Sequence, residues 1–154
     1  MRPFLLEFLT EMNRQFDIVI WSATSYKWVF LKCKEMGLLS SDAFKIRFLL
    51  CESAMFTVQS ELRGKMRVCR VKPLQFIWKR FSMYTPEQTV MLDDVKHNFL
   101  CNPKNGLQIR PFRNALQNRD DNELKRLSVF LSAVLAEHQD FRAIDFKHWE
   151  RYLK

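Results

Sequence analysis

Two adjacent carboxylates follow a short apolar segment near the middle of the chain. Residues 89–92 are typical of a short buried strand, and Asp93 and Asp94 come directly after it. Because like charges repel, such a pair is either a solvated acidic turn or a site that holds a cation. Carboxylate oxygens are the hard ligands that magnesium prefers, so the second interpretation predicts a magnesium site at Asp93 and Asp94.

Other polar residues could make such a site bind phosphate. Ser22 follows a second apolar segment, and Lys72 stands directly before Pro73 at the start of an expected helix. A lysine offsets phosphate charge, a serine hydroxyl and nearby backbone N–H groups donate to phosphate oxygens, and magnesium bridges to them. Plainer alternatives stay open at this point: Ser22 and Thr24 as helix caps, Lys72 as a surface lysine, and the aspartates as a solvated turn.

Strands that alternate with helices are expected to position these residues. Unbroken apolar runs predict buried strands, and apolar residues at helical spacing predict helices. The order indicates an α/β fold with a largely parallel sheet and a small β insertion, in which ligands gather beyond the carboxyl ends of the strands. The expected helices cover 3–16, 26–36 and 72–81, a stretch from the capping pair Asp120 and Glu123 to 135, and the region 146–153; the expected strands cover 17–21, 44–50, 89–92 and 106–109, with a hairpin of 56–59 and 66–69 joined by Arg63, Gly64 and Lys65.

Composition and charge narrow the class of protein. The chain has 154 residues, of which 47% are hydrophobic and 14% aromatic, so we expect a single globular domain over 1–154. No apolar run approaches the roughly 18 residues that span a membrane. Four cysteines without a C-x-x-C pair favour reduced thiols over a zinc site. The net charge of +8 fits either a basic solvated surface or an anionic partner, and charge alone does not choose between them.

Several segments resemble the later motifs of a known phosphatase family. They are IVIWSAT at 18–24, VKPL at 71–74, MLDD at 91–94 and NPKNGLQIRPF at 102–112. These motifs resemble those of haloacid-dehalogenase-type phosphatases, and more narrowly those of the RNA polymerase C-terminal-domain class. The resemblance runs nearly from end to end and is greatest for the branch of that class that carries an upstream ubiquitin-like domain.

The resemblance implies a fold and an activity. The implied fold is a haloacid-dehalogenase (Rossmann-like) parallel sheet flanked by helices, with a small β insertion. The implied activity is that of a magnesium-dependent phosphatase that removes phosphate from phosphoserine or phosphothreonine in proteins through an aspartyl-phosphate. It also implies a nuclear location and the proteasome regulatory particle as a partner.

The family roles can be carried over onto matching residues. Ser22 resembles the hydroxyl of the second motif, which binds the phosphoryl group. Lys72 resembles the lysine of the third motif, which stabilises the phosphate and the nucleophile. Asp93 resembles the magnesium ligand of the fourth motif, and Asp94 falls where relatives have Asp or Asn and supports the same metal site.

The first motif of the family does not occur in this sequence. That motif, D-x-D-x-T, supplies the nucleophilic aspartate and a second aspartate that acts as general acid and base, and the 154 residues contain no such pattern. We therefore expect the chain to be the C-terminal portion of a phosphatase domain, without the nucleophile strand or an upstream ubiquitin-like domain. Such a chain should be inactive and bind magnesium weakly, and the neighbours of the missing central strand should keep unpaired backbone edges.

Two other functions compete with this one. The first is a pseudophosphatase that acts as a non-catalytic scaffold and binds the proteasome or other proteins through a basic, aromatic-rich surface. The second is a nucleic-acid-binding module, suggested by the cationic residues Lys65, Arg67, Arg70, Lys72, Lys79 and Arg80. Phosphate chemistry and surface solvation also explain those cations, so we do not expect nucleic acid as a partner.

Overall fold

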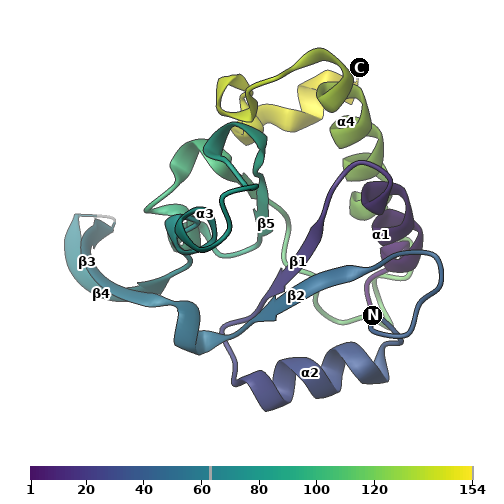
Figure 1. Ribbon diagram of the computed structural model, residues 1–154, viewed down its shortest axis with the longest axis horizontal. Coiled ribbons are helices and arrows are strands. Elements are labelled where there is room, and N and C mark those ends of the chain that lie inside the picture. Colours follow the sequence, from purple (N-terminus) through teal and green to yellow (C-terminus); the bar gives the residue numbers. More distant parts are fainter. Residues whose placement is uncertain (63, 154) are drawn as a thin grey trace. The chain divides into compact units, whose positions relative to one another are not determined.

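The computed structural model describes residues 1–62 and 64–153 (Figure 1). Arg63, expected in the turn of the hairpin, lies outside the described residues. The chain divides into two compact units. Unit 1 comprises residues 1–53, 111–136 and 152–153, and unit 2 comprises residues 54–110 and 137–151.

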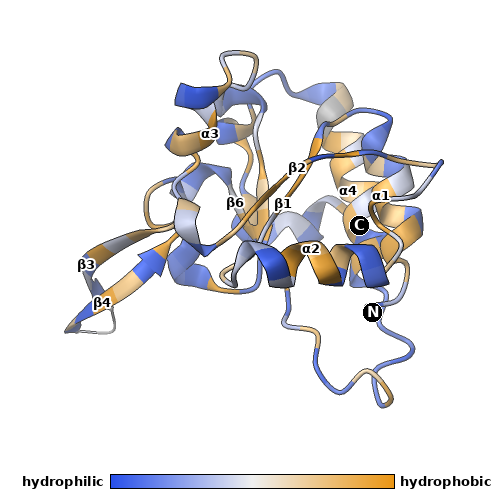
Figure 2. Cartoon of the chain, turned by 60° about the horizontal axis from the view of Figure 1, so that its bottom comes forward, coloured by the Kyte–Doolittle hydropathy of each residue, from blue (hydrophilic) through white to orange (hydrophobic). Residues whose placement is uncertain are grey.

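Unit 1 contains a pair of parallel strands with helices against them. β1 (Ile18–Trp21) pairs with β2 (Ile46–Leu50), and the register shifts between Ile18 and Val19. Parallel neighbours need a long crossover, and α2 (Tyr26–Glu35) provides it. Helix α1 (Leu5–Asn13) contacts β1, and α2 contacts β2. Figures 1 and 2 show α1 beside α4 (Glu123–Glu137).

The helices of unit 1 bury one stripe each. Their buried residues recur three and four positions apart, which is the spacing of one helical face. On α2 the stripe is narrow, since only Val29 and Cys33 are buried among its residues. The buried apolar residues of α1 and α4 are Phe8, Leu9, Met12, Leu124, Leu127, Phe130, Leu131 and Val134.

Unit 2 contains a hairpin and a second parallel pair of strands. β3 (Phe56–Leu62) and β4 (Lys65–Val71) are antiparallel, and α3 (Gln75–Arg80) follows them. β5 (Met91–Asp93) pairs in parallel with β6 (Gly106–Gln108). A Cβ atom on Gly106 would overlap the ring of Phe99, so glycine is required where β6 begins. Short 3-10 helices make up much of the rest, namely η2 (Pro86–Gln88), η3 (Lys96–Phe99), η4 (Pro103–Asn105), η5 (Phe141–Ala143) and all but the last two residues of η6 (Phe146–Leu153).

The α/β class and the parallel pairing of the apolar strands are confirmed, and the predicted insertion is the β3–β4 hairpin. Several boundaries differ from the expected ones. The first helix begins at Leu5, because Phe4 adopts a left-handed conformation with φ of 61°. Helix α4 begins at Glu123 with Asp121, not Asp120, accepting from the Glu123 N–H group. The last helix is a 3-10 segment interrupted at His148.

Within the part of the chain that the structure describes, no helix is both long and apolar enough to span a membrane. The expectation of a single domain over 1–154 stays a prediction.

Candidate functional site

A buried ion pair joins the expected phosphate lysine to the first aspartate. Lys72 follows β4 directly, and Asp93 is the last residue of β5. Their side chains are 8% and 7% exposed, and the Lys72 Nζ atom lies 2.6 Å from Asp93 Oδ2. The interpretations of Lys72 as a surface lysine and of Asp93 as part of a solvated turn are therefore wrong.

The Asp93 carboxylate also receives hydrogen bonds from the loop that follows β5. The Asn98 side-chain amide, itself buried, donates to Oδ2 at 2.9 Å, and the Val95 N–H donates to Oδ1 at 2.8 Å. The backbone around Lys72 is tied to the same loop, since the Lys72 N–H donates to the Asn98 carbonyl at 3.4 Å. These contacts hold the Lys72 ammonium group and the Asp93 carboxylate in one place. Sequence reasoning missed Asn98, because nothing in the sequence indicates that its amide turns back toward Asp93.

The second aspartate has a different environment. Asp94 is exposed, and its carboxylate has no hydrogen-bond or ion-pair partner among residues 1–62 and 64–153. Only its backbone carbonyl is engaged, by the Gln108 side-chain amide at 3.1 Å. The two neighbouring carboxylates thus differ: Asp93 is buried and hydrogen-bonded, whereas the Asp94 carboxylate faces water.

The hydroxyl expected to bind phosphate lies in unit 1. Ser22 follows β1, and its N–H donates to the Leu50 carbonyl of the neighbouring strand at 3.0 Å. Its Oγ atom accepts from the Thr24 N–H at 3.2 Å and lies 2.9 Å from the Thr24 hydroxyl. The N-cap residue of α2 is Ser25, not Ser22 or Thr24, and its side chain makes no capping hydrogen bond. The interpretation of Ser22 and Thr24 as caps of this helix is therefore wrong. A compact turn therefore places a hydroxyl and the start of a helix at the carboxyl end of β1.

The residues of unit 2 fit a magnesium site in part. Magnesium takes one or two carboxylates and completes its octahedron with water and substrate oxygens. Asp93 and Asp94 supply carboxylates, but three donors already point at the Asp93 oxygens. In the described part of the chain, no three or more His, Cys, Asp and Glu residues form a group that could hold a metal ion.

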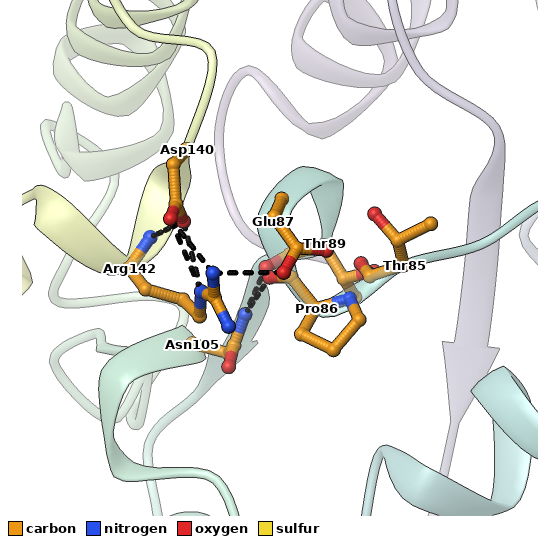
Figure 3. Close-up of polar contacts among 7 residues, drawn as sticks. All are labelled: Thr85, Pro86, Glu87, Thr89, Asn105, Asp140 and Arg142. Atoms are coloured by element: carbon orange, nitrogen blue, oxygen red, sulfur yellow. Dashed lines mark hydrogen bonds and ion pairs between the residues drawn. The ribbon is translucent and has the colours of Figure 1, made fainter.

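A second polar cluster stabilises the loops around β5 (Figure 3). The Arg142 guanidinium pairs with Asp140 at 2.8 Å and with Glu87 at 2.7 Å, which joins η5 to η2. The Asn105 amide donates to the carbonyls of Pro86 and Thr89 at 2.6 and 2.8 Å. Because these bonds hold the segment that leads into β5, they help to place Asp93 at the end of that strand.

Comparison with known proteins assigns the chain to a family. The family model described as NLI interacting factor-like phosphatase matches residues 1–142. The chain belongs to this family. The motif residues Ser22, Lys72, Asp93 and Asp94 all lie inside the matched range.

The chain is also similar to curated relatives along almost all of its length. It is 51% identical over 155 residues to the ubiquitin-like domain-containing CTD phosphatase 1 of Danio rerio, and 49% and 48% identical over the same length to the proteins of that name from Gallus gallus and Homo sapiens. Each alignment covers 99% of this chain and 48% of the relative. The chain therefore spans about half the length of the curated relatives that it matches.

Proposed function

We propose that this chain is the C-terminal portion of a magnesium-dependent phosphatase domain that acts on phosphoserine or phosphothreonine in proteins. The observation that carries the proposal is the buried Lys72–Asp93 pair at the carboxyl end of β5. Burying a lysine and an aspartate together costs desolvation energy, and such a pair is a poor choice for stability alone. A lysine fixed at a strand end is suited to hold a phosphoryl group as charge develops on it.

The geometry supports different roles for the two aspartates. Asp93 would orient Lys72, because its oxygens already accept from Lys72, Asn98 and the Val95 N–H. Asp94 would be the metal ligand, because its exposed carboxylate can reach an ion without breaking a bond. The resemblance assigned the ligand role chiefly to Asp93, so the proposal exchanges the two roles. Bound magnesium would neutralise charge on the phosphoryl oxygens.

The proposal includes the Ser22 hydroxyl as a hydrogen-bond donor to the phosphoryl group, and one haloacid-dehalogenase (Rossmann-like) sheet as the frame. The support for both is the resemblance, together with the turn of Ser22 and Thr24 at the carboxyl end of β1. The nucleophile would come from a D-x-D-x-T strand that these 154 residues do not contain. We therefore propose that the chain alone releases no phosphate and binds magnesium weakly. The nuclear location and the proteasome partner rest on the resemblance alone.

The test is to place a D-x-D-x-T strand upstream of residue 1 and to measure phosphate release from a phosphoserine peptide with magnesium. Removing an electrostatic stabiliser from an active site costs about 10²–10³ in kcat. We expect such a loss for Lys72→Met and Asp94→Asn. Asp120→Asn is the matched control, since Asp120 is also an exposed aspartate and lies outside the cluster. A completed chain that is inactive, or whose activity survives both site changes, would contradict the proposal.

A second candidate function is a non-catalytic scaffold. The intact later motifs without a D-x-D-x-T motif support it, as do large apolar side chains exposed on the hairpin and α2. Capture of proteasome subunits by the 154-residue chain would favour the scaffold, provided that the completed chain stays inactive. Release of phosphate by the completed chain would favour the enzyme.

A further inference from the structure

The β3–β4 hairpin exposes apolar side chains that the phosphatase site does not use. Met66 and Val68 are 63% and 68% exposed, although both lie within a regular strand. Figure 1 shows the hairpin extending away from α3 and β5, and Figure 2 shows hydrophobic and hydrophilic residues alternating along it. Two exposed apolar side chains next to each other on one strand face are suited to a partner surface.

The hairpin has open edges. Among the described residues β3 and β4 pair only with each other, so each strand has one edge without a strand neighbour. The N–H of Lys72, which follows β4, points away from β3, since it donates to the Asn98 carbonyl. Backbone groups alternate in direction along a strand, so Met66 and Val68 also direct their N–H and C=O groups away from β3. The open part of the β4 edge therefore lies over residues 65–68.

The side chains along this edge alternate in kind. Lys65 and Arg67 lie on one face of the hairpin, whereas Met66 and Val68 lie on the other, because successive residues of a strand point to opposite faces. All four residues are exposed. The described strands β3 and β4 contain three cationic residues, Lys65, Arg67 and Arg70, and one acidic residue, Glu61. An incoming strand thus meets cations on one face and apolar groups on the other.

We propose that the β4 edge at residues 65–68 binds an extended segment of a partner protein in which acidic and apolar residues alternate. The segment adds as a third strand: its backbone pairs with Met66 and Val68, its carboxylates face Lys65 and Arg67, and its apolar side chains cover the exposed pair. A second copy of this hairpin is the weaker occupant, because it would bring Lys65 and Arg67 against like charges. The proposal needs no phosphate and goes beyond the proposed function.

Fluorescence anisotropy with the 154-residue chain tests the proposal. The probe is a labelled eight-residue peptide of alternating glutamate and valine, and the comparison peptide has four glutamates followed by four valines. We expect the alternating peptide to bind about tenfold more tightly, since only it presents charges to one face and apolar groups to the other. Equal binding of the two peptides would overturn the proposal.

Charge and backbone variants locate the binding edge. The double variant Lys65→Glu with Arg67→Glu should weaken binding of the alternating glutamate and valine peptide about tenfold. It should also create binding of a peptide of alternating lysine and valine. Val68→Pro should abolish binding, because it removes an outward N–H from the β4 edge. Gln59→Pro is the matched control at the opposite edge, since Gln59 is the register partner of Val68. Far-UV circular dichroism checks that both proline variants stay folded.

Three outcomes separate other occupants and the phosphatase site. Asp94→Asn should leave peptide binding unchanged, so failure of the phosphatase proposal does not affect this test. Self-association that Val68→Pro abolishes, without peptide binding, would assign the edge to a second copy and overturn the proposal. Binding of single-stranded RNA in place of the peptide, lost in the double glutamate variant and falling with salt, would also overturn it.

Discussion

At the scale of single residues, the two neighbouring aspartates show how a strand end divides similar side chains between different tasks. Asp93 is still part of β5, so its side chain stays buried beside Lys72 and Asn98. Asp94 is one position further on and is exposed. Adjacent residues at a strand end point to opposite sides, so one can be buried while the next meets solvent. A carboxylate can thus serve as a buried counter-ion at Asp93 and as an exposed group able to bind a metal ion at Asp94.

The first prediction follows from this difference. Asp93→Asn leaves the buried Lys72 ammonium without its carboxylate, and breaking a buried ion pair in this way costs about 3–5 kcal/mol of unfolding free energy. Asp94→Asn changes an exposed side chain that has no partner among the described residues, so it should shift the unfolding free energy by less than about 0.5 kcal/mol. Urea unfolding of the 154-residue chain measures both.

A third variant tests the physical reason. Lys72→Met in the Asp93→Asn background removes the uncompensated charge, so it should restore part of the lost stability. If Asp93→Asn and Asp94→Asn destabilise the chain equally, or if the double variant is the least stable, the counter-ion role of Asp93 is wrong.

The second prediction concerns two cysteines in unit 1. A hydrogen bond with the Ser53 hydroxyl, with Sγ and Oγ 3.0 Å apart, lowers the pKa of the partly exposed Cys51 thiol, whereas burial raises the pKa of Cys33. Because the thiolate is the nucleophile, iodoacetamide at neutral pH should modify Cys51 well before Cys33. Ser53→Ala should slow the modification of Cys51 and leave Cys33 unchanged. Mass spectrometry of timed samples measures both, and faster labelling of Cys33 would contradict the prediction.

The sequence predicts the residues of the candidate site better than it predicts their contacts. Ser22, Lys72, Asp93 and Asp94 stand out because each follows or precedes an apolar run, and position after a strand is a local property. The burial of Lys72 and the turn of Asn98 toward Asp93 depend on how β5 and its loop pack against the end of β4. Such contacts join residues that are 5 and 21 positions apart, and no periodicity encodes them.

At the scale of elements, periodicity predicts which segments are helices and strands but not where they end. The apolar pattern of residues 3–16 continues past both ends of α1, because Phe4 and the turn after Asn13 still contribute apolar side chains. The hairpin is longer than predicted, partly because Ser60, Glu61, Lys65 and Arg70 are polar and so carry no apolar signal. The ends of elements depend on backbone conformation and tertiary contacts, which a count of apolar residues does not contain.

The third prediction concerns the clip formed by Arg142, Asp140 and Glu87, which joins η5 to η2 (Figure 3). Hydrogen bonds from the Arg142 side chain, with a further one from its N–H, lower the pKa of Asp140 from 3.8 to about 2. The folded pKa lies below the unfolded one, so the stabilisation is complete above about pH 4 and is lost as the pH falls toward 2. Carbon-13 NMR of the Asp140 carboxyl should titrate with a midpoint near 2.

Two variants serve as the test and the control for the clip. Arg142→Ala removes the donors and should raise the Asp140 midpoint toward 3.8. Glu87→Gln removes the other partner of Arg142 but leaves the hydrogen bonds to Asp140, so it should change the midpoint less. A midpoint near 3.8 in the unchanged chain would contradict the role of Arg142.

At the scale of the whole molecule, each compact unit contains a parallel pair of strands, and among the described residues each of these strands has one edge without a strand neighbour. In unit 1 the Ser22 N–H faces β2, so alternation directs the backbone groups of Val19 to the other edge of β1. In unit 2 the Asp93 carbonyl faces β6, so the backbone N–H and C=O groups of Leu92 point to the other edge of β5. Both strands carry half-buried or buried side chains. Strands of this kind normally have neighbours on both sides, and the family resemblance assigns a D-x-D-x-T strand to such a position.

The last prediction tests whether that strand completes the sheet. A chain with a D-x-D-x-T strand placed upstream of residue 1 should protect the amides of Val19 and Leu92 from hydrogen exchange, because a neighbouring strand gives their outward N–H groups acceptors. The amide of Ser22 is the internal control, since it already donates to Leu50. If Val19 and Leu92 exchange equally fast with and without the added strand, the strand does not lie at these edges, and the proposed single sheet is wrong.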